Sequence, residues 1–173
     1  MTSATGDSKD FLGQEFLTWL WYYGEKNQWT IPLANNEELS YGLEDLLVMS
    51  PEEKEDCSQR LKGTYPVGCP EAHAALEEGK KVSVTRMLLC CKDREWVVTW
   101  KADNFTFSTL QLLQPTTNHV QDRFSELAID LEQAVALLDR IYYFFLETRL
   151  SPLWQQQEVP AIQEWIQKRR ETL

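Results

Sequence analysis

The chain of 173 residues is 43% hydrophobic and 12% aromatic, which favours a folded protein and excludes a chain that is disordered throughout. Its 27 acidic and 17 basic residues give a formal net charge of −10, which argues against nonspecific DNA binding by the molecule as a whole. No apolar stretch reaches the ~18 residues of a membrane span, and no signal peptide pattern opens the chain. We therefore expect a cytoplasmic protein with a polar tail at residues 1–9 and a single domain at 10–173.

The first predicted element is an apolar helix, FLGQEFLTWLWYYGEK, at residues 11–26. Its apolar arc is wide, so we expect burial on more than one side. Gly24 is interpreted as the C-terminal stop. Trp19 and Trp21 belong to an aromatic cluster. Such a cluster is more typical of a core or a subunit interface than of a ligand platform, and the sequence does not decide between core and interface.

Residues 25–38 are predicted to form a loop, followed by a strand that ends near Met49. Leu39, Tyr41 and Leu43 alternate as a strand requires, although a helical turn at residues 43–47 fits the sequence as well. A second strand is expected at 57–62.

Residues 37–56 form an acidic run, in which eight carboxylates stand against Lys54. Such a run is typical of a solvated face and less often of a surface that docks a basic protein. The acids are Glu37, Glu38, Glu44, Asp45, Glu52, Glu53, Glu55 and Asp56.

A short helix is predicted to begin at Pro70 and to end at Gly79. The clearest pattern follows it, an antiparallel β-meander over residues 81–92, 95–102 and 104–113. Its middle strand alternates sharply and turns two tryptophans and a valine to one side. Because three strands alone are unstable, this aromatic side should pack on helices.

A long helix is predicted at 118–149, with Asn118 as its N-cap. Its apolar positions recur at three- and four-residue spacings. Near its end the segment IYYFFL is apolar all round, so Tyr142, Tyr143 and Phe144 are predicted to be buried or to lie in a subunit interface. A terminal helix at 158–171 follows. The fold class is therefore α+β: an antiparallel meander packed against the long helix and the N-terminal aromatic helix.

Catalytic and metal-binding patterns are absent from the sequence. The seven glycines form no phosphate-binding loop, the four cysteines form no Cys-x-x-Cys pair, and the two histidines, His73 and His119, lie far apart. Glu78-Gly79-Lys80 has the letters of a magnesium nuclease motif but stands at a helix end. The sequence thus predicts a binding protein with no catalytic residue, no metal and no cofactor.

Basic residues gather around the predicted meander, where a strip that contacts phosphates is geometrically possible. The alternative is that they are ordinary polar positions of edge strands. The candidate nucleic-acid-binding residues are Lys80, Lys81, Arg86, Arg94 and Lys101.

The order of these elements resembles the C-terminal half of the recombination-associated RdgC family over roughly residues 11–150. The likeness is carried by the helix with LTWLW, by ALEEGKKV at residues 75–82 with the hairpin after it, and by Asp122-Arg123-Phe124 at the start of the long helix. The chain is shorter and more acidic than the classical members.

The resemblance implies a homodimer that associates with double-stranded DNA without sequence preference, lies on the nucleoid and modulates recombination. The first functional hypothesis is therefore a non-enzymatic, DNA-associated protein. The alternative is an acidic interaction module that kept the fold and binds a second copy or a basic protein without binding DNA.

Overall fold

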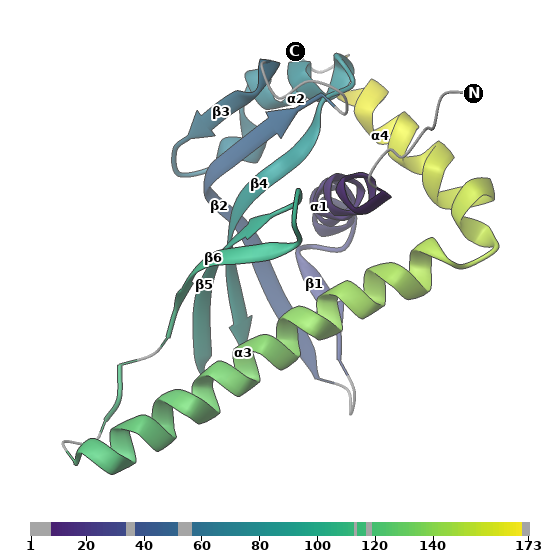
Figure 1. Ribbon diagram of the computed structural model, residues 1–173. Helices are drawn as coiled ribbons and strands as arrows, with labels where there is room; N and C mark the ends of the chain where they lie inside the picture. The colour runs from purple at the N-terminus through teal and green to yellow at the C-terminus, as the bar shows by residue number, and fades with distance from the viewer. Residues whose placement is uncertain (1–7, 34–36, 52–56, 113, 117–118, 171–173) are drawn as a thin grey trace, which may run out of the picture.

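A computed structural model describes residues 8–33, 37–51, 57–112, 114–116 and 119–170 (Figure 1). Its helices are α1 (Ser8–Lys26), α2 (Pro70–Glu77), α3 (Val120–Arg149) and α4 (Val159–Arg170), with short helical turns η3 (Pro66–Gly68) and η4 (Trp154–Glu158). Its strands are β1 (Thr30–Pro32), β2 (Glu38–Ser50), β3 (Gln59–Lys62), β4 (Lys81–Cys91), β5 (Arg94–Lys101) and β6 (Thr106–Gln111). The molecule is an α+β protein, as the sequence predicts.

The strands form one six-stranded antiparallel sheet in the order β1-β2-β4-β5-β6, and β3 also pairs with β2. The predicted meander is confirmed as β4, β5 and β6, although β6 begins at Thr106 rather than at residue 104. Strand β2 joins β4 along most of its length. The long connection between them carries β3 and α2, so these two elements lie near the same end of the sheet (Figure 1).

The two faces of the sheet differ in their surroundings. On β5, Trp96, Val98 and Trp100 are at most 2% exposed, whereas the residues between them are partly exposed. The same alternation runs along β4 from residue 84 to 90. Because neighbouring side chains of a strand point to opposite faces, the sheet has one buried inner face and one outer face that solvent reaches.

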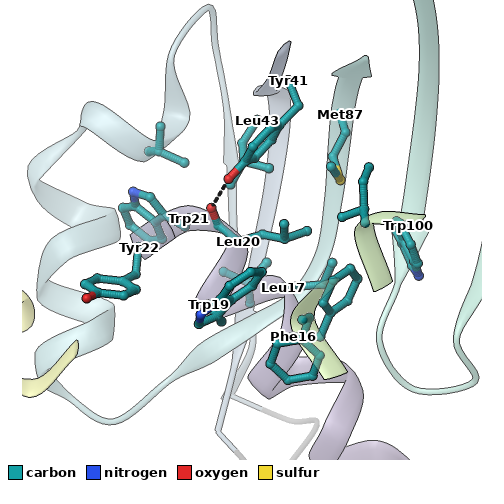
Figure 2. Close-up of a cluster of buried hydrophobic side chains, with 14 of the residues drawn as sticks. Phe16, Leu17, Trp19, Leu20, Trp21, Tyr22, Tyr41, Leu43, Met87 and Trp100 are labelled. Atoms are coloured by element: carbon teal, nitrogen blue, oxygen red, sulfur yellow. Dashed lines mark hydrogen bonds between the residues drawn. The ribbon is translucent and has the colours of Figure 1, made fainter. Parts of the chain in front are cut away.

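Helix α1 fills the inner face, held between the curved sheet and α3 (Figure 1). Figure 2 shows its side chains pointing into the core, and Phe16, Leu17 and Leu20 are fully buried. The Tyr41 hydroxyl donates to the Leu20 carbonyl at 2.8 Å, and burial raises the pKa of this phenol well above its usual value. The phenol therefore stays protonated and remains a donor at every physiological pH.

Helices α3 and α4 close the core from the far side of α1. Phe145 of α3 packs on Phe16, with ring centroids 5.2 Å apart. Glu25 accepts from the indole nitrogens of Trp21 and Trp165, both at 2.7 Å, and so ties α4 to α1. Among the described residues, no helix combines the length and apolar character that crossing a bilayer requires.

Some predictions about element ends are wrong. Gly24 lies inside α1, which continues to Lys26. A Cβ at position 24 would stand 2.3 Å from the Trp29 ring, and this close approach explains the glycine. The predicted loop at 25–38 contains β1, whose three residues pair with the start of β2. Helix α1 begins at Ser8, within the predicted tail, and residues 1–7 lie outside the described part.

The N-cap predicted at Asn118 also lies outside the described residues. In the structure His119 occupies the cap position of α3, and it makes no side-chain cap hydrogen bond.

The contact between α1 and the β5–β6 turn leaves no room for a side chain. A Cβ on Gly13 would stand 2.2 Å from the Ala102 carbonyl oxygen, a backbone atom that cannot rotate away. We predict that Gly13→Ala lowers the free energy of unfolding by about 1–3 kcal/mol, as overpacking does, in urea denaturation. Gly42→Ala is the control, because a Cβ there meets nothing within 4 Å. Equal stability of the two variants would contradict this helix–sheet contact.

Candidate nucleic-acid interface

Two cation-bearing rows cross the outer face of the sheet near β3. The first row runs from Arg60 of β3 to Lys101 of β5. Between these two cations lie Val48, which pairs with Arg60, and Val84, which pairs with Lys101; the two valines also pair with each other. Paired residues of antiparallel strands share a face, so the two cations flank a pair of valines. This row therefore has an apolar centre with a positive charge at each end.

The second row lies directly beside the first. Lys62 stands opposite Leu46, and Arg86 pairs with Thr99 of β5. An irregularity in β2 between Leu43 and Leu47 brings the neighbouring Asp45 carboxylate to 3.4 Å from the Arg86 guanidinium. We call the four cations Arg60, Lys62, Arg86 and Lys101 the basic outer patch.

The basic outer patch spans β3, β2, β4 and β5, three strand spacings of about 4.8 Å or roughly 14 Å in all. A duplex presents one phosphate for about every 3.4 Å of axis on each strand, so several phosphates fit across this width. The patch is therefore large enough to contact a nucleic-acid backbone at more than one point.

Most of the charge in the patch is not neutralised by the surrounding protein. Arg86 pairs with Asp45, whose side chain is 56% exposed, and an ion pair this open to water is weak. Within the described part of the chain, no ion pair involves Arg60, Lys62 or Lys101. These three cations are available to an external anion.

The five cations predicted from the sequence do not form one strip. Arg86 and Lys101 belong to the patch. Lys80 follows α2, where its ammonium group lies 2.8 Å from Glu78, and Lys81 begins β4 opposite Ser50. Arg94 points to the inner side of the sheet. Arg60 and Lys62 were not predicted from the sequence. Their alternation in QRLK, within an expected strand, indicates a shared face only once the neighbouring strand is known.

Arg94 has a structural task, since it helps to hold α3 on the sheet. Its guanidinium contacts the Asp130 carboxylate at 3.4 Å and the Gln133 amide oxygen. Asp130 is 4% exposed and also accepts from the Trp96 indole at 2.9 Å. A buried carboxylate needs such partners, so this cluster fixes the position of α3 against β5.

Two of the residues proposed for a subunit interface lie in the core. Trp19 is 1% exposed and Trp21 is fully buried, because α1 is surrounded by the sheet, α3 and α4. They offer no surface to a partner, and the interface prediction for these two is corrected. Tyr142 and Phe144 are partly buried in the same aromatic cluster, whereas Tyr143 is 60% exposed.

The start of α3 exposes an apolar stripe that the rest of the helix buries. Ala134, Leu138, Ile141 and Phe145 pack in the core, alternately three and four residues apart. The same spacing continues toward the N-terminus through exposed side chains, where the helix extends past the strands (Figure 1). We call this segment, residues 120–131, the α3 overhang; Val120 is 67%, Phe124 70% and Leu131 45% exposed, and Leu127 is partly buried.

The structure describes only part of the acidic run at residues 37–56. Glu37 lies 2.9 Å from the Lys92 ammonium group, and Asp45 pairs with Arg86. Four of its acids, at residues 52, 53, 55 and 56, lie outside the described residues. Across the described ranges, no group of three or more His, Cys, Asp or Glu side chains could hold a metal ion.

Comparisons of the chain with protein-family models, with curated proteins and with solved structures yield no match. The basic outer patch and the α3 overhang are thus the two features of the described chain that indicate a function.

Proposed function

We propose that this protein associates with double-stranded DNA through the phosphate backbone, with the basic outer patch as its contact surface. One observation carries the proposal: four cations from three strands lie in adjacent rows on an open sheet face of a protein whose net charge is −10. A local concentration of positive charge in so acidic a chain favours an anionic ligand, and a phosphate backbone is such a ligand.

The chemistry of the patch favours backbone contact over base recognition. Between the cations lie Leu46, Val48, Val84 and Thr99. None of these side chains is aromatic, so the rows lack the stacking surface that proteins use for single strands. The two rows consist of strand side chains only, so they include no helix that could enter a groove. Binding should therefore be independent of sequence and should favour the duplex.

The net charge limits the affinity. Repulsion from the other faces opposes the attraction at the patch, so we expect a dissociation constant in the range of about 10⁻⁴ to 10⁻⁶ M, typical of nonspecific binding. The resemblance to the RdgC family supplies a setting for such binding, namely a non-enzymatic, cytoplasmic or nucleoid-associated protein that modulates recombination.

Charge reversal in the patch tests the proposal. We predict that Arg60→Glu with Lys62→Glu weakens binding of a 30-bp duplex at least tenfold in fluorescence anisotropy at 50 mM salt. For the unmodified protein, the affinity should fall with salt with a logarithmic slope of about −3 to −4, since each phosphate contact contributes about −0.9.

A matched control separates the patch from the total charge. Lys92→Glu with Lys168→Glu removes two exposed cations elsewhere on the surface and changes the net charge by the same amount. This control should retain most of the affinity. Equal loss in both double variants, or no duplex binding by the unmodified protein at low salt, contradicts the proposal.

A second candidate function is self-association through the α3 overhang. Its apolar positions continue a spacing of alternately three and four residues, which is the pattern of a helix–helix seam. Gln121 and Ala128 flank the stripe on one side and carry no charge, so two overhangs can lie antiparallel without repulsion along that side. For a basic protein partner, the described part of the acidic run supplies Glu37 and Asp45, each in an ion pair that is exposed to water.

We predict that the protein sediments as a dimer at about 50 µM and that Phe124→Glu with Leu131→Glu makes it a monomer. Both side chains are exposed in the single chain, so the melting temperature of the separated subunit should change little. Ile129→Glu is the control, because Ile129 is 51% exposed but lies on another side of α3. If the unmodified protein is monomeric at this concentration, the dimer proposal is wrong, whereas the proposal of DNA binding is not affected.

A further inference from the structure

Strand β6 forms a free edge of the sheet, because it pairs only with β5 and is the last strand in the order β1-β2-β4-β5-β6 (Figure 1). Its residues are all exposed except Leu110, which is partly buried. The pairing with β5 is regular except at Ser108, which has no partner there. The strand therefore has little cover from the rest of the described chain.

The free edge presents unpaired backbone groups. In an antiparallel sheet, an edge strand uses roughly half of its N–H and C=O groups in its one ladder, and the others face away from the sheet. Among the residues that the structure describes, none supplies a hydrogen bond to these outward groups of β6. A row of alternating donors and acceptors is complementary to an extended polypeptide, since a further strand pairs with all of them at once.

The opposite edge of the same sheet has features that prevent such pairing. Strand β1 has three residues and ends at Pro32, which lacks an N–H, and β3 has four residues, of which Arg60 and Lys62 are charged. Short strands, prolines and charged side chains are the usual protection of an edge. Strand β6 has six residues, TFSTLQ, with no proline and no charge, so this edge remains open to a partner.

The absence of charge extends beyond the strand. Residues 104–121 include no Asp, Glu, Lys or Arg, although 25% of the whole chain is charged. A charged group in a partner strand would find no counter-ion along this segment, so the edge favours an uncharged segment. The net charge of −10 on the molecule favours a neutral or basic protein as the source of that segment.

The two sides of the edge indicate which side chains fit. On the inner side, Phe107 packs on Trp100 with ring centroids 5.9 Å apart, and it is still 41% exposed. On the outer side, Thr106 and Thr109 present exposed hydroxyls. Because cross-strand neighbours on one face pack together, apolar residues of a partner would cover Phe107, and hydroxyl-bearing residues would lie beside the threonines.

We propose that β6 binds an extended, uncharged segment of a neutral or basic protein, which joins the six-stranded sheet as a further strand. Apolar and hydroxyl-bearing side chains alternate along this segment. The site consists of backbone groups at the sheet edge, whereas the basic outer patch consists of cationic side chains on the outer face. The inference therefore does not rest on DNA binding.

A defined peptide tests the inference. The probe is a fluorescein-labelled peptide of three threonine–valine pairs with a lysine at each end, and the control peptide has proline in place of each valine, because proline has no N–H to donate. In fluorescence anisotropy, we expect the whole protein to bind the probe with a dissociation constant below about 0.1 mM and the control at least tenfold more weakly. Equal binding of the two peptides, or no binding of the probe at about 0.5 mM protein, overturns the proposal.

Amide hydrogen exchange, measured by NMR, locates the bound peptide. In the free protein, alternate amides of Thr106–Gln111 should exchange quickly, because they face the open edge. The probe should slow these amides at least fivefold and leave the amides of β1 and β3 unchanged. Slowing at β1 or β3 without slowing at β6 overturns the proposal. If the outward amides of β6 are already protected without peptide and lose that protection on dilution, the edge pairs with a second copy of the chain, which also overturns it.

Discussion

Packing of α1 against the inner face of the sheet organises the fold, because α3 and α4 in turn pack on α1. Phe16, Leu17 and Leu20 are fully buried, and the helix backbone at Gly13 approaches the β5–β6 turn without an intervening side chain. At about 1.5–3 kcal/mol for each large apolar side chain removed from water, this helix contributes a large share of the core energy. The inner face of the sheet is thereby filled, and the four cations of the basic outer patch lie on the other face.

This arrangement turns an ordinary alternation of residues into a charged surface. Four strands, β3, β2, β4 and β5, form this part of the outer face, and each contributes one position to each of the two cation-bearing rows. No single strand carries more than two of the four cations, so the register of β3, β4 and β5 brings the four charges together. The total of −10 describes the far field of the protein, whereas a bound phosphate responds to the nearest few charges, because salt screens the rest within about 10 Å.

The extent to which the sequence predicts this structure follows from the range of each interaction. The alternation in β5 and the aromatic density of α1 are local patterns, and they predict the meander, the covered face and the fold class correctly. The pairing of β3 with β2 is a long-range choice, so Arg60 and Lys62 could not be placed beside Arg86 in advance. Gly24 looks like a helix stop in sequence, and the structure shows instead that the Trp29 ring, five residues later, lies too close to this position for a side chain.

The dependence on long-range packing also explains why Trp19 and Trp21 were predicted at a subunit interface. A tryptophan in an apolar helix is equally typical of a core and of a subunit contact, and the number of elements that surround α1 decides between them. Trp19 and Trp21 are core because α3 and α4 return to cover the helix. The α3 overhang shows the opposite case, in which one apolar stripe is buried along half of a helix and exposed along the other half.

Protection of individual lysines from acetylation by bound duplex, measured by mass spectrometry, tests whether DNA lies on the basic outer patch. A 30-bp duplex at low salt should slow the modification of Lys62 and Lys101 several-fold and leave Lys92 and Lys168 unaffected. Protection at Lys168 without protection at Lys62 and Lys101 would contradict this placement, because the duplex would then lie on the helical side of the molecule.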